Sequence, residues 1–222
     1  MAGPALPERA APYAVSVMEF FVGSGLAAAA GLNAWMPLFL LGLADRFLPA
    51  VELPASWAWL SSDLALWITG ILLVIEVVAD KFPAVDSVND VIQTAIRPAA
   101  GGIVFGAGSS AETVRVDDPS LFSGSAGWDA WAPIVIGVVI ALVVHALKAA
   151  VRPVANLATA GLAAPALSAG EDVSSFALVA AAIFVPVLAV VLLVAVVVVA
   201  VLLLRRRRHA RRQHATYPIS ET

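Results

Sequence analysis

Three side chains with the chemistry of a binding site recur at helical spacing in the second half of this chain. His145, Lys148 and Arg152 are separated by three and four residues, so a helix places them on one face. A charged side chain at bilayer depth costs about 2.5–3.5 kcal/mol on insertion scales and needs a compensating interaction. The pattern therefore predicts a polar site for an ion, a proton or an anionic group.

Acidic and amide side chains elsewhere in the chain are suited to complete this site. Glu76 and Asp80 are four residues apart and share a face of another apolar segment. Arg97 adds positive charge, and Asn156 adds a neutral ligand. The candidate ligand-binding or ion-binding residues are Glu76, Asp80, Arg97, His145, Lys148, Arg152, Asn156, Glu171 and Asp172.

The same charges have a structural interpretation, which the sequence leaves open. They would form an ion-pair network that only holds helices together, with Lys148 and Arg152 extending to the membrane interface. Other chemistries lack support: there is no cysteine, no second histidine near His145, and no hydrolase, zinc-protease or phosphate-loop motif. We therefore expect no metal and no cofactor, and we assign no catalytic residue.

The composition is that of an integral membrane protein. Of 222 residues, 61% are hydrophobic and 13% are charged, against about 25% charged residues in soluble proteins. Several runs exceed the roughly 18 apolar residues of a membrane-spanning helix. The expected fold is an all-α integral membrane bundle of about five or six spans. We divide it into a polar leader (1–12), one transmembrane domain (13–204) with a polar loop (109–129), and a basic tail (205–222).

Segment boundaries follow from breaks in the apolar runs. The first run divides near residues 31–33 and Pro37 into a span at Val15–Leu32 and a shorter piece at Ala34–Ala44. Further helices are expected at 64–79, which Ser62 or Asp63 would cap, at 131–151, and at 173–204. The last run is too long for one span unless it is tilted, kinked at Pro186 or protruding. Ser168 and Glu171 have capping-box spacing ahead of the last run.

Two Arg-Pro steps predict interruptions. Proline disfavours helix in the residue before it, so Arg97 and Arg152 are expected to mark helix breaks. Residues 79–96 then read as an amphipathic interfacial helix, and residues 97–108 and 156–166 as interrupted or re-entrant helices. The two steps lie 55 residues apart within a weak sequence repeat, and whether this is a true duplication stays open.

Small residues mark faces where helices approach closely. Glu19, Gly23, Ala27 and Gly31 recur every four residues, so we expect this face to point into the bundle. Whether Glu19 is buried there or solvated near the headgroups stays open. Gly102, Gly106 and Ser110 repeat the same spacing.

The tail gives the expected location and partners. Six of the 13 basic residues lie between Arg205 and Arg212, directly after an apolar run. Such a tail indicates a cytoplasmic C-terminus bound to anionic lipid headgroups rather than to nucleic acid. The expected location is the inner membrane of a bacterium, with the lipid bilayer as partner and a homo-oligomer left open.

Several motifs resemble a known family. These are GLNAWMPLFLLGLADR (31–46), ADKFPAVDSVND (79–90), IRPAAGG (96–102) and HALKAAVRPVANLATAG (145–161). They resemble the bacterial membrane family called domain of unknown function 4126, over roughly Val15 to Leu203, and the H-x-x-K-x-x-x-R-P-x-x-N run is the most specific part. The resemblance implies a multi-pass inner-membrane protein and no particular activity.

Three functions follow as hypotheses. The first is a transporter or channel for an ion or small solute that uses the charged site, with Glu76, Asp80 and Glu171 balancing charge or relaying protons. The second is an interaction or scaffold protein whose charges are structural. The third is a membrane enzyme acting on lipid or isoprenoid, for which Glu171 and Asp172 beside Arg152 are the only acid–base candidates.

Overall fold

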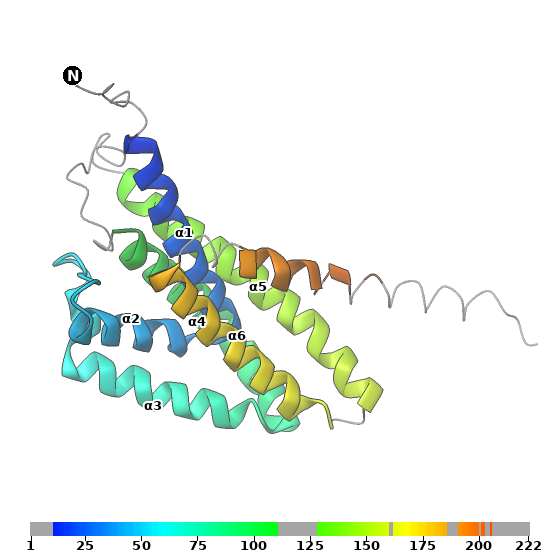
Figure 1. The fold of residues 1–222 in the computed structure, drawn as a ribbon. Helices are drawn as coiled ribbons and strands as arrows, with labels where there is room; N and C mark the ends of the chain where they lie inside the picture. Colours follow the sequence, from blue (N-terminus) through cyan, green and yellow to red (C-terminus); the bar gives the residue numbers. More distant parts are fainter. Residues whose placement is uncertain are drawn as a thin grey trace, which may run out of the picture.

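The computed structural model describes residues 11–110, 128–159, 162–185, 191–199, 201–202 and 205, and for residues 11–17, 83–88, 90, 110, 128–130 and 156 it describes the backbone alone. Within this part of the chain every regular element is helical (Figure 1). The elements are α1 (Ala11–Leu32), α2 (Trp35–Phe47), the 3₁₀ helix η1 (Ala58–Ser61), α3 (Asp63–Ala79), α4 (Pro83–Ser110), α5 (Trp128–Thr159) and α6 (Ala164–Phe184). Residues 191–199 are also helical.

Helix α1 is the centre of the bundle and packs against α4, α5 and α6, while α2 and α3 pair beside them (Figure 1). Its alanines from Ala27 to Ala30 are fully buried. Gly23 faces the Phe105 ring of α4, and Gly31 faces Val144 of α5. The predicted inward face of α1 is confirmed at these positions, whereas Glu19 is half-buried. Small side chains bring the backbones close enough for three helices to surround one.

Helices α4 and α5 approach most closely at a pair of glycines. A Cβ atom on Gly101 would lie 2.8 Å from the carbonyl oxygen of Gly137. Gly102 and Gly106 also face neighbours, namely Ile134 and Trp57. The predicted glycine-rich contact is therefore present, although its tightest point is Gly101.

The expected break in the first apolar run is present at Asn33. The Asn33 side-chain oxygen accepts hydrogen bonds from the backbone N–H groups of Trp35 and Met36, at 3.2 and 3.0 Å. An asparagine in this role satisfies the first free donors of a helix, so α2 begins here. Pro37 lies inside α2, near its start, where proline is tolerated.

The predicted breaks at the two Arg-Pro steps are wrong. Pro98 lies inside the 28-residue helix α4, and Pro153 lies inside the 32-residue helix α5. The expected separate pieces at 79–96, 97–108 and 156–166 are therefore parts of longer helices and one turn. Proline removes one helical hydrogen bond, but neighbouring helices can hold the backbone in place. Here both arginines are buried and held by contacts to other helices, which favours the continuous form.

The predicted cap of the last run is also wrong. Helix α6 begins at Ala164, so Ser168 and Glu171 lie inside it and their side chains contact other elements. Pro165 at its first turn is the better start signal. The helix ends at Phe184, just before Pro186, in agreement with the predicted interruption. By contrast, Ser62 caps α3 as predicted, since its side chain accepts a bond from the Ala65 N–H.

Burial follows an unusual pattern for charged and apolar side chains. Arg97, Glu76 and Asp80 are buried, whereas the outer face of α3 carries exposed large apolar residues: Leu64, Trp67, Ile68, Ile71, Val74, Ile75 and Val78. Two helical stretches of the described chain, Trp131–Thr159 and Ala164–Phe184, are long and apolar enough to cross a membrane. Helix α3 is close to that length, with 17 residues.

Candidate functional site

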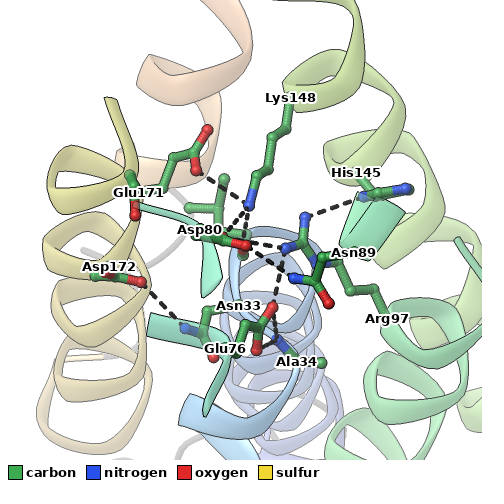
Figure 2. A network of polar contacts seen from close by, with 12 residues as sticks. Asn33, Ala34, Glu76, Asp80, Asn89, Arg97, His145, Lys148, Glu171 and Asp172 are labelled. Atoms are coloured by element: carbon green, nitrogen blue, oxygen red, sulfur yellow. Dashed lines mark hydrogen bonds and ion pairs between the residues drawn. The ribbon is translucent and has the colours of Figure 1, made fainter. Parts of the chain in front are cut away.

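The candidate site lies where α1 ends and α2 begins. Side chains from the end of α3, from α4 and α5, and from the first half of α6 converge on this junction (Figure 2). We call the set the polar cluster. Its charged members are Glu76, Asp80, Lys81, Arg97, Lys148, Arg152, Glu171 and Asp172.

Glu76 and Arg97 form the deepest ion pair. The Arg97 Nη2 and Glu76 Oε1 atoms are 2.9 Å apart, and the two side chains are 0% and 1% exposed. The Glu76 carboxylate also accepts a bond from the Ala34 N–H, at 3.1 Å. An anion beside the N-terminus of a helix is stabilised by the free N–H groups there. Glu76 thus ties α3 to the start of α2 and to α4.

Asp80 follows α3 and is the acceptor that α4 and α5 share. Its Oδ2 atom lies 3.2 Å from the Lys148 Nζ, 3.2 Å from the Arg152 Nη2 and 3.8 Å from the Arg97 Nη2. Its Oδ1 atom accepts a bond of 2.8 Å from the Asn89 amide. The arginines of both Arg-Pro steps, Arg97 and Arg152, therefore lie beside this one carboxylate.

Lys148 has as many acceptors as it has N–H donors. Its Nζ donates to the Leu32 carbonyl oxygen at 3.0 Å and lies 3.2 Å from Asp80 and 3.0 Å from Glu171. A lysine ammonium offers three N–H groups, so the three acceptors account for them. The Leu32 carbonyl belongs to the last turn of α1, where carbonyls lack helical partners. Lys148 therefore closes the end of α1.

Arg152 holds Glu171 through two hydrogen bonds. The Arg152 Nε donates to Glu171 Oε1 at 3.1 Å, and the Nη2 donates to the other carboxylate oxygen. This paired geometry is the strong form of an arginine–carboxylate contact. Arg152 and Lys148 are 4% and 1% exposed along their side chains, so neither extends to an interface as the structural interpretation suggested.

His145 links Arg97 to the edge of the bundle. Its Nδ1 lies 3.1 Å from the Arg97 Nη1, and its Nε2 lies 3.1 Å from the Thr94 hydroxyl. Because a guanidinium only donates, the Nδ1 atom must accept and the ring proton sits on Nε2. In this arrangement His145 is a neutral acceptor that orients Arg97.

A smaller group extends the cluster toward the surface. The Lys81 Nζ lies 3.1 Å from Asp172 and 2.9 Å from the Ser168 hydroxyl. The other Asp172 oxygen accepts from the Asn33 amide at 3.1 Å. Asn33 thus caps α2 with one side-chain atom and binds α6 with another.

Among the side chains that the structure describes, the cluster is balanced in charge. Its four carboxylates, Glu76, Asp80, Glu171 and Asp172, face the four cations Lys81, Arg97, Lys148 and Arg152. Buried charges are expensive unless each finds a partner with good geometry. The four carboxylates and four cations meet that requirement. An added charge would disturb the balance between them.

Of the nine residues chosen from the sequence, eight meet in the cluster. The exception is Asn156, whose side chain lies outside the described part of the chain. Sequence reasoning missed Asn33, Lys81, Asn89, Thr94 and Ser168. Asn33 and Lys81 stand in the quoted motifs, but short polar residues at helix ends are too common to indicate a site. Among the described residues, no three metal-ligating side chains come together, and the cluster's carboxylates bind its cations instead.

These features define a class: an all-helical protein with a charge-balanced polar core and an apolar exterior. A comparison with protein families identifies which one, because the chain matches Domain of unknown function (DUF4126) over residues 20–206. The chain belongs to this family, as the resemblance predicted. Comparisons with curated proteins and with solved structures found no match.

Proposed function

We propose that the chain is a multi-pass integral membrane protein. The support is the reversed burial, with charged side chains inside and large apolar ones on the outer face of α3. Water would make this surface unfavourable, whereas lipid makes it favourable. The basic residues 205–212 favour an inner bacterial membrane with the C-terminus in the cytoplasm.

Within that membrane, we propose that the protein transports an ion or a small solute through the polar cluster. The observation that carries this proposal is the interruption between α1 and α2 inside the bundle, directly beside the balanced charges. Irregular backbone at membrane depth requires protein or a cavity around it, and transporters place interrupted helices at their binding sites. Asp80 and Glu171 also share the partners Lys148 and Arg152. A proton or cation could therefore exchange at either carboxylate without leaving a charge unpaired.

The test is flux into liposomes that contain the purified protein. Ion and pH gradients are applied, and internal pH and ion content are followed with dyes. The variant Lys148→Met with Glu171→Gln removes one charge of each sign, so the cluster remains neutral and the protein is expected to fold. We expect at least a tenfold loss of flux in this variant.

The matched control is Arg46→Met with Asp63→Asn, which removes an ion pair at the surface, remote from the cluster. It should retain wild-type flux. Flux that is unchanged in the Lys148 and Glu171 variant would overturn the proposal. So would the absence of flux for every ion tested with folded wild-type protein.

A second function has one observation in its favour. The eight charges already satisfy one another, which suits a scaffold protein whose ion pairs only fix helix packing. Under this function the Lys148 and Glu171 variant would still co-purify with a defined partner, and only its thermal stability would change. The enzyme hypothesis is weaker, because Glu171 and Asp172 are both held in ion pairs.

A further inference from the structure

An apolar groove reaches the polar cluster from one side. It has a volume of about 470 Å³ and lies between α5, α6 and the helix at residues 191–199. Its walls include Leu32, Leu147, Val151, Leu167, Val196 and Val199. Of the described residues that line it, Lys148 and Glu171 are the charged ones. Pockets of this size, with apolar walls and a few polar groups, are typical of small-molecule sites.

Glu171 is the outermost member of the ion pairs at the base of the groove. Its side chain is 15% exposed, against 1% for Lys148 and 4% for Arg152. It lies between these two cations and contacts both. A rotation of the Glu171 side chain would uncover the sides of Lys148 and Arg152 that it now binds, while both cations keep their contacts with Asp80.

The position that Glu171 occupies is shaped for a carboxylate. The Arg152 Nε and Nη2 donate to separate oxygens of one carboxylate, and the Lys148 Nζ contacts one of them. A guanidinium recognises a planar carboxylate in this way, whereas a spherical ion would leave one donor without an acceptor. An apolar tail on the same ligand would lie along the groove walls.

We propose that the groove binds a small monocarboxylate with an apolar tail, whose carboxylate takes the place of Glu171 on Lys148 and Arg152. Glu171 receives one proton in the same event. The proton is required because Glu171, once displaced from Lys148 and Arg152, would otherwise be a partly buried carboxylate without those two cations. This inference rests on the proposed transport function, since it names the solute and makes the proton its co-substrate.

The charges balance at each stage. Before binding, the described side chains of the cluster supply four carboxylates and four cations. After binding, three side-chain carboxylates and one ligand carboxylate face the same four cations, while Glu171 is a neutral acid. One proton and one anion therefore enter together, and the transported unit carries no net charge.

Binding of radiolabelled octanoate to the protein in lipid nanodiscs tests the proposal, with empty nanodiscs subtracted. We expect saturable binding that weakens about tenfold per pH unit at alkaline pH, as one linked proton requires. A pH-indicator dye should report one proton taken up per octanoate bound. In Glu171→Gln, which resembles the protonated acid, binding should persist without the pH dependence and without proton uptake.

Two neighbouring substitutions test the groove itself. Ala195→Trp fills it, because Ala195 lines its wall, and should reduce octanoate binding at least tenfold. Val194→Trp adds the same ring to an exposed position on the same helix and should leave binding unchanged. No octanoate binding, equal binding in the two variants, or binding without proton uptake would each overturn the inference.

The failure of this inference can be told apart from the failure of the proposed function. If another solute shows cluster-dependent flux and octanoate does not bind, the carboxylate ligand is wrong and the transport function stands. If octanoate binds with proton uptake but no solute shows flux in liposomes, the transport function is wrong and the binding site stands.

Discussion

At the scale of single residues, the chain keeps its charges inside by pairing each one. The Glu76–Arg97 pair shows this pairing most clearly, since both side chains are almost completely buried. Removing such a charge from water costs several kcal/mol, and a partner with good geometry offsets it. An ion pair at the surface, such as Arg46–Asp63, loses less hydration and contributes about 0–1 kcal/mol.

Arg97→Met should therefore destabilise the protein by about 3–5 kcal/mol, because it leaves Glu76 buried without its cation. Thermal unfolding in detergent measures the effect. Arg46→Met, the matched change at the surface, should change stability by less than about 1 kcal/mol. Equal melting temperatures for the two variants would mean that the buried pair contributes little.

At the scale of helices, glycine decides how closely α4 and α5 approach. Gly101 and Gly137 face one another across the crossing, where a side chain on either one would meet the backbone of the other. Their contact places Arg97 on α4 and His145 on α5 at hydrogen-bond distance. The close crossing is thus a condition for the geometry of the polar cluster.

Gly137→Ala should cost about 1–3 kcal/mol, because the new methyl group collides with the backbone of Gly101 and the helices must separate. Gly170→Ala in α6 is the control, since a methyl group there meets nothing within 4 Å. It should leave stability unchanged or raise it by about 0.5–1 kcal/mol, through the better helix propensity of alanine. Melting temperatures that move in the same direction would contradict the crossing argument.

At the scale of the whole molecule, burial is reversed relative to a protein in water. Large apolar side chains cover the outside of α3, and Val191, Val194, Val198, Val199 and Leu202 are also exposed. The charged residues of the polar cluster lie inside and reach the surface mainly through the outer pairs at Glu171 and Lys81. Under the proposed membrane location, lipid around the bundle makes this arrangement favourable.

Ile71→Lys places a charge near the middle of the outer face of α3 and tests this arrangement. In a bilayer the change costs about 2.5–3.5 kcal/mol, so the protein retained in membranes after an alkaline wash should fall severalfold. Glu52→Lys, at an exposed position before η1, introduces the same side chain and should leave the membrane fraction unchanged. Unchanged retention of Ile71→Lys would argue that α3 does not face lipid.

The sequence by itself determined the helical class, the family and eight members of the polar cluster. Long apolar runs can satisfy their backbone only as helices, and ionisable residues among them need partners wherever they lie. The break near Asn33 was readable because the first apolar run is too long for one span and residues 31–33 and Pro37 interrupt it. These inferences depend on local chemistry, which the order of residues carries directly.

The tertiary structure alone decided which charged side chains pair and whether α4 and α5 continue through their prolines. The spacing suggested that Glu76 and Asp80 pair with the basic face. Asp80 does contact Lys148 and Arg152, whereas Glu76 binds Arg97, and Glu171 also holds Lys148 and Arg152. Proline predicted two breaks, but the helices pass through both steps because contacts to other helices outweigh a local preference. Ser168 and Glu171 likewise had the spacing of a cap and instead face Lys81 and Arg152. Each outcome depends on which distant segments meet, and that depends on how the helices cross.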